Sequence, residues 1–593
     1  MISNKIVSLT SVYVNMPDQV RLAVDIWMPV DFKKGAKIPA VFIFTRYWRS
    51  LGFVKDNLEL QPLYKTAVYF ASKGYALVVA DSRGSGASFG TRTGEYSPKE
   101  IGDIGQLLDW VGNQSWSNGK VASMGTSYTG NTAFIAAQSG SKMLKIVAAN
   151  SSDFDSYSQL MVPGGISNSW MKGNWGEMVA AMDQNNVRKL NEITNKKTSE
   201  EYNKNFLGVR PVDTDTDGSL LREAVAEHKK NFNIGFDSLD LTFKDSTKEV
   251  KKMIESASIY GYLDSINAFG VPIFYRTGWQ DAGTAEGAVS LFNSINNSIH
   301  IMIGPWDHGM SSRADPYQPG EKAQPLPLEE KLDSIFNAID PVVNSQETIS
   351  FEKMRILEYF TFGENKWKST SKWPLPDTIN QRFYLSSENT LLSSPPESKS
   401  GEDLYQVNPQ ASTGNSNRWH TQTGGNFVHP FDRREDDDLL LIYDSPVLEE
   451  DIEITGHPLL QLFVRSTVED GAIFAYLEDV GPDGYVRLIT EGCLRLTHAK
   501  VSEESPPYWI PGPYHSFKKK DQILITADAV TEMNFNLYPI SVLIRKEHQI
   551  RLAISGADKD TFELIQGSES ATYRVERNCN FPSYLQLPII PRK

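Results

Sequence analysis

Short apolar runs alternate with helix-compatible stretches in the first quarter of the chain. The apolar runs are 40–44, 76–80, 121–124 and 146–149, and the helical stretches between them include 64–72 and 100–111. Strands that are covered on both faces read as continuous apolar runs, and helices between successive strands supply that cover. Residues 1–153 are therefore predicted to form the first part of an α/β domain with a mostly parallel sheet.

The pattern changes to polar, helix-compatible sequence over residues 154–260, including 219–230 and 246–255. Apolar runs return at 271–275 and 300–303 and continue the sheet within 261–372. A helical segment inserted between two strands of such a sheet lies above the carboxyl ends of the strands, where ligands bind. We therefore expect residues 154–260 to form a helical cap.

A third pattern begins after the proline-rich junction Trp373-Pro374-Leu375-Pro376. Short segments of alternating polarity follow, separated by turn residues: 382–385, 459–464, 472–477, 486–490, 522–525 and 549–554. Alternation with a period of two is typical of strands with one buried face. Residues 373–593 are predicted to form an antiparallel β-sandwich.

Composition narrows the functional classes. The 593 residues exceed what one hydrophobic core organises, and a formal net charge of −14 argues against nucleic acid or an anionic membrane as a partner. No apolar run approaches the roughly 18 residues of a membrane span, and the polar start Met1 to Lys5 lacks the apolar core of a signal peptide. The two cysteines provide neither a disulfide framework nor zinc-ligand spacing. A cytoplasmic location is expected.

One serine stands in the setting that a nucleophile requires. Ser127 follows the apolar run 121–124 in Gly125-Thr126-Ser127-Tyr128-Thr129-Gly130 and precedes the helix-like stretch 131–138. A sharp strand-to-helix turn exposes such a serine, small neighbours relieve crowding, and the next backbone N–H faces a developing oxyanion. The second glycine comes one position later than is usual. On this segment alone, a serine in an ordinary turn is an equal alternative.

An acid and a histidine follow in the expected chain order. The run 271–275 leads to Asp281, and the run 300–303 leads to His308 in a Gly/Pro-rich loop. Hydrolases with this type of sheet place their triad as Ser, then Asp or Glu, then His. Asp307 is a rival acid, but an immediate neighbour is poorly placed to bind the imidazole. We therefore favour Asp281.

These motifs together resemble the cocaine-esterase-like (CocE/NonD) serine hydrolases, which are related to X-Pro dipeptidyl-peptidases and α-amino-acid ester hydrolases. The resemblance covers nearly the whole chain. It is carried by 19–29, 42–47, 81–90 and 109–120, by the Gly-x-Ser-Tyr-x-Gly form at 125–130, and by the Gly-Trp-x-Asp and Gly-Pro-Trp-x-His motifs at 278–281 and 304–308. In that family the late glycine is the usual form.

The resemblance implies an α/β-hydrolase domain with a helical cap insertion and a C-terminal jelly-roll domain. It implies Ser127 as nucleophile, His308 as base and acid, and Asp281 as the group that orients His308. It also implies an oxyanion hole made by the Tyr47 hydroxyl and the Tyr128 N–H, although Arg46 stands where many relatives have proline. No metal or organic cofactor is implied, and the jelly roll is expected to buttress the site and a homodimer contact.

The predicted activity is hydrolysis of an ester or amide of a small acyl compound, with Trp170, Trp175 and Tyr202 as candidate wall residues. An α-amino-acid ester hydrolase is disfavoured because Ala282-Gly283-Thr284 replace the acids that those relatives carry after the triad aspartate. An X-Pro dipeptidyl-peptidase, an acyltransferase with the same triad and a non-catalytic binding protein on the same fold stay as alternatives. The sequence does not specify the substrate.

Overall fold

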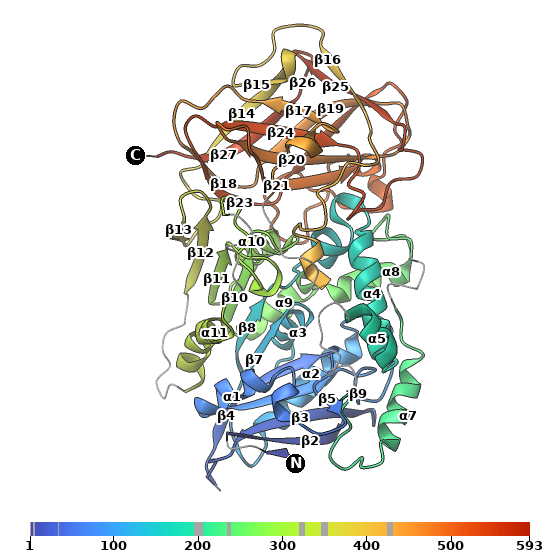
Figure 1. The fold of residues 1–593 in the computed structure, drawn as a ribbon, viewed down its shortest axis with the longest axis vertical. Helices are drawn as coiled ribbons and strands as arrows, with labels where there is room; N and C mark the ends of the chain where they lie inside the picture. The colour runs from blue at the N-terminus through green and yellow to red at the C-terminus, as the bar shows by residue number, and fades with distance from the viewer. Residues whose placement is uncertain are drawn as a thin grey trace.

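The N-terminal half of the chain is organised around one twisted sheet (Figure 1). The computed structural model describes residues 2–3, 6–33, 35–194, 205–233, 239–318, 326–344, 354–423 and 431–592. Within these ranges the sheet has eleven strands. In spatial order they are β1 (Ile2–Ser3), β2 (Val7–Asn15), β3 (Arg21–Pro29), β6 (Ala76–Asp81), β4 (Ile38–Thr45), β7 (Ser117–Thr126), β8 (Leu144–Asn150), β10 (Ile273–Gly278), β11 (Ile299–Gly304), β12 (Arg355–Thr361) and β13 (Lys366–Thr370).

The strands from β6 to β12 run parallel, and both faces of this part are covered. Alternate residues of each strand join different cores, so that Val41 packs on one side and Phe42 on the other. The helices on the Val41 side are α1 (Tyr64–Ser72) and α11 (Leu328–Val343), and those on the Phe42 side are α2 (Pro98–Gly112), α3 (Tyr128–Ala136) and α10 (Thr284–Ser294). The predicted parallel sheet with continuous apolar strands is confirmed.

Residues between β8 and β10 form a mainly helical insertion. Its longer elements are α4 (Ser169–Asp183), α5 (Val187–Thr194), β9 (Phe206–Val209), α7 (Ser219–His228), α8 (Lys248–Ala257) and α9 (Leu263–Phe269). Strand β9 pairs with β5 (Leu51–Phe53), which ties the insertion to the sheet domain. Helices α4, α5, α7 and α8 run along one side of the molecule in Figure 1.

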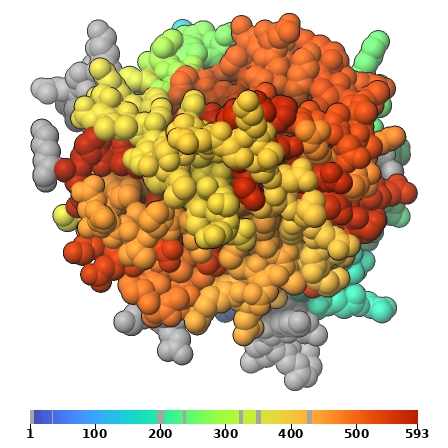
Figure 2. Space-filling model, turned by 90° about the horizontal axis from the view of Figure 1, so that it is seen from above, coloured from blue at the N-terminus to red at the C-terminus, as the bar shows by residue number. Residues whose placement is uncertain are grey.

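The C-terminal part is a β domain that covers one end of the molecule (Figure 2). Over the described residues it contains fourteen connected strands, paired antiparallel except for β15 with β17. They are β14 (Ile379–Ser386), β15 (Thr390–Leu392), β16 (Glu402–Gln406), β17 (Leu441–Asp444), β18 (Ile452–Gly456), β19 (Leu459–Ser466), β20 (Ala472–Val480), β21 (Val486–Arg495), β22 (Val530–Asn536), β23 (Ile540–Ile544), β24 (Gln549–Ser555), β25 (Thr572–Asn578), β26 (Phe581–Pro582) and β27 (Tyr584–Ile590).

One predicted strand of the β domain is wrong. Residues 522–525 belong to no strand or sheet of the described part of the chain. The Ile523 N–H donates to the carbonyl of Thr497 at 3.0 Å, the Gln522 N–H donates within its own turn to the carbonyl of Lys519 at 3.2 Å, and Leu524 is 85% exposed. The alternation of polarity there marks a loop with one buried side, because no neighbouring strand lies alongside to pair with it. The predicted fold class, an α/β-hydrolase domain followed by a β domain, is nevertheless confirmed.

No helix among the described residues combines the length and apolar character that crossing a membrane requires.

Candidate active site

Ser127 occupies a strained turn between strand β7 and helix α3. Its backbone has φ 61° and ψ −129°, a conformation that non-glycine residues rarely adopt outside functional sites. A β-carbon on Gly125 would lie 2.0 Å from the carbonyl oxygen of Thr129, and one on Gly130 would lie 2.3 Å from Oγ of Ser152. Both glycines are therefore required by close approach of the chain, and the predicted sharp turn is present.

Thr129 explains why the second glycine can come one position late. Its hydroxyl donates to the carbonyl of Thr126 at 2.7 Å and accepts from the Thr126 N–H at 2.8 Å. This side chain closes the turn from within, while the tight contact with the neighbouring strand falls on Gly130. The turn is therefore formed with threonine at position 129 and glycine at position 130.

The predicted acid and histidine meet at the ends of adjacent strands. Strands β10 and β11 pair in parallel, and Nδ1 of His308 lies 2.8 Å from Oδ1 of Asp281, which is fully buried. Asp307 instead accepts hydrogen bonds from the N–H and hydroxyl of Ser312 at 2.7 and 2.6 Å, so it fastens its own loop. The choice of Asp281 over Asp307 therefore agrees with the geometry.

The histidine loop lies beside the serine turn. The Gly309 N–H donates to Oγ of Ser151 at 3.0 Å, and a β-carbon on Gly309 would lie 3.5 Å from Cγ2 of Thr126. Within the described part of the chain no hydrogen bond joins the Ser127 hydroxyl to the His308 ring. Such bonds are often long or misaligned without substrate and shorten when it binds.

Burial and charge act in opposite directions on the pKa values of His308 and Asp281. Burial opposes protonation of His308, but the adjacent Asp281 carboxylate outweighs this and raises the pKa of the imidazole. Burial likewise opposes ionisation of Asp281, yet His308 and the hydrogen-bond donors around the carboxylate lower its pKa. The acid is thus held ionised, and its bond to Nδ1 leaves Nε2 as the free nitrogen of a neutral ring.

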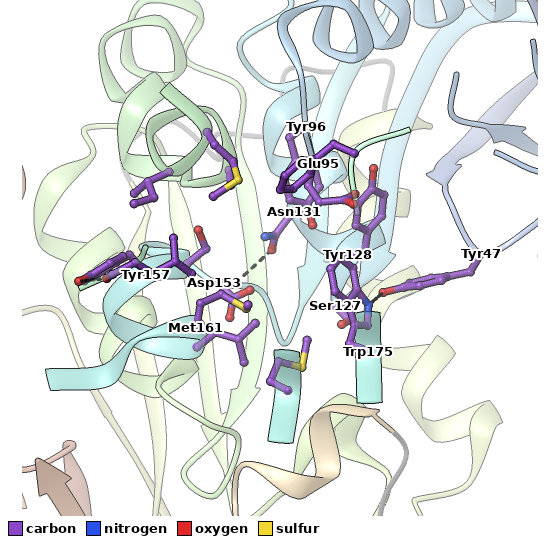
Figure 3. A pocket seen from close by; sticks show the side chains of 18 residues that line it. Tyr47, Glu95, Tyr96, Ser127, Tyr128, Asn131, Asp153, Tyr157, Met161 and Trp175 are labelled. Carbon is purple, nitrogen blue, oxygen red and sulfur yellow. Dashed lines mark hydrogen bonds between the residues drawn. The ribbon is translucent and has the colours of Figure 1, made fainter. Parts of the chain in front are cut away.

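Tyr47 and Tyr128 place two donors near the serine (Figure 3). The Tyr47 hydroxyl oxygen accepts a hydrogen bond from Nε1 of Trp175 at 2.8 Å, so the phenolic proton stays available for another acceptor. Burial raises the pKa of Tyr47 to about 12, which keeps that proton in place at neutral pH. Tyr128 is the first residue of α3, where backbone N–H groups have no partner inside the helix.

Arg46 forms ion pairs through both terminal nitrogens of its guanidinium. Its guanidinium is buried, contacts the Glu95 carboxylate, and bonds Oδ1 of Asp183 at 3.2 Å. It also lies over the Trp175 ring, with 5.1 Å from Cζ to the ring centroid. The arginine thus fixes the loop that carries Tyr47, and it braces the tryptophan that binds the phenol.

The serine opens into a cavity of about 90 Å³ between the sheet domain and the insertion. Its far wall is apolar and comes from the insertion; the wall residues include Leu160, Met161, Met171, Trp175 and Ile254. Asp153 is a carboxylate that lines this cavity and interacts electrostatically with His308. Burial raises the pKa of Asp153 to about 7, although the nearby His308 acts to lower it. Its backbone N–H donates to Oδ1 of Asn131 at 3.1 Å (Figure 3).

The sequence-based wall residues have different outcomes. Trp175 lines the cavity, whereas Trp170 does not and stacks on His420 of the β domain, with 3.8 Å between ring centroids. Tyr202 lies outside the described residues. The sequence reasoning missed Gln422, which donates a hydrogen bond to Asp281 from the β domain. No local pattern marks a glutamine 141 positions away as a neighbour of that acid.

Within the described ranges no group of three or more His, Cys, Asp or Glu side chains is arranged to hold a metal ion.

Comparison with known proteins gives matches over both halves of the chain. Residues 18–310 match the family model described as X-Pro dipeptidyl-peptidase (S15 family), and residues 352–585 match the X-Pro dipeptidyl-peptidase C-terminal non-catalytic domain. A Mycobacterium bovis protein named as a candidate serine esterase is 35% identical, with 98% of this chain and 95% of that protein covered. The cocaine esterase of a Rhodococcus species is 24% identical, with 98% of each chain covered. The crystal structure of an aminopeptidase from a marine sediment archaeon, Thaumarchaeota archaeon, superimposes with a TM-score of 0.72 at 19% identity, covering 98% and 97% of the two chains.

Proposed function

Because this chain belongs to the CocE/NonD serine hydrolases, relatives of the S15 X-Pro dipeptidyl-peptidases, we propose that it hydrolyses esters of small apolar acids through Ser127, His308 and Asp281. The single observation that carries the proposal is the strained Ser127 at the mouth of an apolar cavity, beside the 2.8 Å contact between His308 and Asp281.

The reaction proceeds in two balanced halves. Ser127 Oγ attacks the ester carbonyl carbon while Nε2 of His308 takes the hydroxyl proton, and a tetrahedral oxyanion forms. The C–O bond to the leaving group then breaks, and His308 returns the proton to the departing alkoxide, giving the alcohol and an acyl-serine. Water repeats the sequence on the acyl-serine and releases the carboxylic acid and free Ser127.

Two donors hold the oxyanion in each half. The Tyr47 hydroxyl, oriented by Trp175, and the Tyr128 N–H at the start of α3 supply them. Each such donor stabilises the transition state by about 3–4 kcal/mol in comparable hydrolases. Asp281 stays ionised throughout and stabilises the imidazolium that forms on His308.

The cavity favours a substrate with a small apolar acyl group, which would bind inside it. Aliphatic and aromatic side chains form most of its wall, and its volume of about 90 Å³ suits a short chain or one ring better than a polymer. The flexible methionines among these residues tolerate differences in acyl shape.

Labelling tests the nucleophile. A fluorophosphonate probe should label the native chain and not Ser127→Ala, and p-nitrophenyl esters of two to eight acyl carbons should show a maximum at a short acyl length. Ser72→Ala is the matched control, because Ser72 is exposed at the end of α1 and far along the chain from the site. Equal labelling of Ser127→Ala and Ser72→Ala would remove Ser127 from the mechanism.

A second candidate, cleavage of aminoacyl esters or amides, is favoured by Asp153. This carboxyl group lines the same cavity and interacts electrostatically with His308. Its ionised form can therefore bind an ammonium group on the acyl part of the substrate. Aminoacyl p-nitroanilides tested on the native chain and on Asp153→Asn distinguish the two candidates. A rate that needs a free amino group and falls in Asp153→Asn supports the second candidate, and indifference to both supports the first.

A further inference from the structure

We propose that the β domain is part of the reacting centre, with Gln422 as a positioning residue for Asp281 and Arg418 as the anchor of the loop that carries this acid. The inference rests on the proposed function and extends it. It also departs from the family model of the C-terminal part, whose description is non-catalytic.

Gln422 donates from Nε2 to Oδ1 of Asp281, the same oxygen that accepts Nδ1 of His308 at 2.8 Å. The other carboxylate oxygen accepts from the Thr277 hydroxyl at 3.3 Å. Asp281 is fully buried and Gln422 is buried, so water does not substitute for any of these donors. The amide of Gln422 therefore fixes the rotation of the carboxylate and shares the charge of the oxygen that binds the imidazole.

Arg418 holds the backbone of the acid loop. Its Nη2 donates to the carbonyl of Trp279 at 3.0 Å, its Nη1 donates to the carbonyl of Ala282 at 3.3 Å, and its own carbonyl accepts the Ala282 N–H at 3.2 Å. Ala282 has φ 42°, a left-handed conformation that costs energy for a residue with a β-carbon. The loop on both sides of Asp281, from Trp279 to Ala282, is thus kept in place by three hydrogen bonds with one β-domain residue.

The segment 417–423 is itself fixed to the β domain and to the insertion. Asn417 accepts the N–H groups of Trp419 and His420 at 3.0 Å each and donates to the Thr561 hydroxyl at 3.0 Å. The Trp419 indole N–H donates to Glu491 in β21. The His420 ring stacks on Trp170 of α4 with an interplanar angle of 4°. A segment with this many fixed contacts can position a partner, which a mobile loop cannot do.

Removing the Gln422 amide should affect the chemical step more than substrate binding. Gln422→Met keeps the length and volume of the side chain and removes its donor. We expect the fluorophosphonate labelling rate constant, and kcat for p-nitrophenyl acetate, to fall between about 10-fold and 100-fold, the value of a hydrogen bond to a charged group. KM should change less than about two-fold, because Gln422 does not line the cavity.

The pH profile separates positioning from a merely structural role. Without the amide, Oδ1 of Asp281 keeps its full charge and stabilises the protonated imidazole more, so the acidic limb of kcat/KM should move to higher pH. In Gln422→Glu the protonated carboxyl can still donate to Asp281, whereas the ionised form repels it. That variant should retain activity on the acidic side of its profile and lose it at a pH where the native chain is fully active.

Gln410→Met is the matched control, since Gln410 is exposed and lies earlier in the same connecting stretch. Labelling of Gln422→Met within two-fold of the native rate at every pH, or identical pH profiles for the Met and Glu variants, would overturn the proposal. Where Gln422→Met fails to fold, the Glu variant decides alone by its pH profile. Absence of labelling in the native chain, by contrast, contradicts the proposed function itself and is distinguishable from these outcomes.

Discussion

Replacing Tyr47 by phenylalanine removes one hydroxyl and should lower kcat by about 10²–10³-fold, or about 2.7–4 kcal/mol of transition-state stabilisation. The structure favours the full effect for two reasons. The phenol keeps its proton, because burial raises its pKa to about 12. Its oxygen also already accepts from Trp175 at 2.8 Å, which directs the remaining proton away from the indole. KM for a short p-nitrophenyl ester should change little, since the oxyanion exists only after attack.

The same change has a separate cost in stability. In Tyr47→Phe the indole N–H of Trp175 loses its acceptor in a buried site, which costs about 1–3 kcal/mol of folding free energy. Urea denaturation measures that term independently of the rate. The two effects can therefore be separated on one protein preparation.

A double-mutant cycle with Trp175→Phe tests the assigned arrangement. Trp175→Phe alone should lower kcat by about 10-fold, because the phenol loses its orientation but keeps its proton. In the Tyr47→Phe background the same change should have almost no further effect on kcat. A Tyr47→Phe enzyme within three-fold of the native kcat, or rate losses that add fully in the double variant, would refute the assignment of Tyr47 as an oxyanion donor.

Three further outcomes follow from the same site. The proposed base, His308, can accept a proton only when it is unprotonated, and Asp281 raises its pKa, so kcat/KM should fall as pH decreases through a midpoint above the ordinary value of about 6.5; a midpoint below 6 contradicts this. Asp281→Asn should lower kcat by about 10⁴-fold while its circular dichroism spectrum stays native. A decrease in kcat of less than about 10-fold would argue against Asp281 as the residue that orients His308. Gly130→Ala would set a β-carbon 2.3 Å from Oγ of Ser152 and should lower the free energy of unfolding, measured by urea denaturation, by about 1–3 kcal/mol. Gly102→Ala in α2, with open space around it, should raise that free energy by about 0.5–1 kcal/mol. Equal stabilities of the two variants would contradict the close packing at the turn.

The parts of the site that could be predicted from sequence are those set by local chain geometry. Ser127 follows a buried strand, and the glycines around it reflect contacts made within a few residues or with the adjacent strand. Asp281 and His308 end neighbouring parallel strands, so chain order alone places them at one edge of the sheet.

The parts that could not be predicted depend on contacts between distant segments. The sequence around Gln422 and Arg418 does not indicate their contacts with Asp281 and Trp279. A glutamine and an arginine in a turn-rich stretch are equally common on an exposed surface that has no such partner. The strand wrongly predicted at 522–525 also shows that local sequence does not determine contacts between distant segments. Alternating polarity is a local property, whereas a strand also needs a neighbour with free backbone groups.

Helix α4 contacts both ends of the reacting constellation. Trp175 binds the Tyr47 hydroxyl, and Trp170, about one and a half turns earlier, stacks on the segment that carries Gln422. A displacement of this helix that widened the cavity would therefore loosen the proposed oxyanion donor Tyr47 and the support of Asp281 at the same time. A position of α4 that admits bulkier acyl groups is therefore expected to lower the rate of the chemical step. A small compound that bound behind α4 and displaced it would be expected to inhibit the enzyme without contacting Ser127.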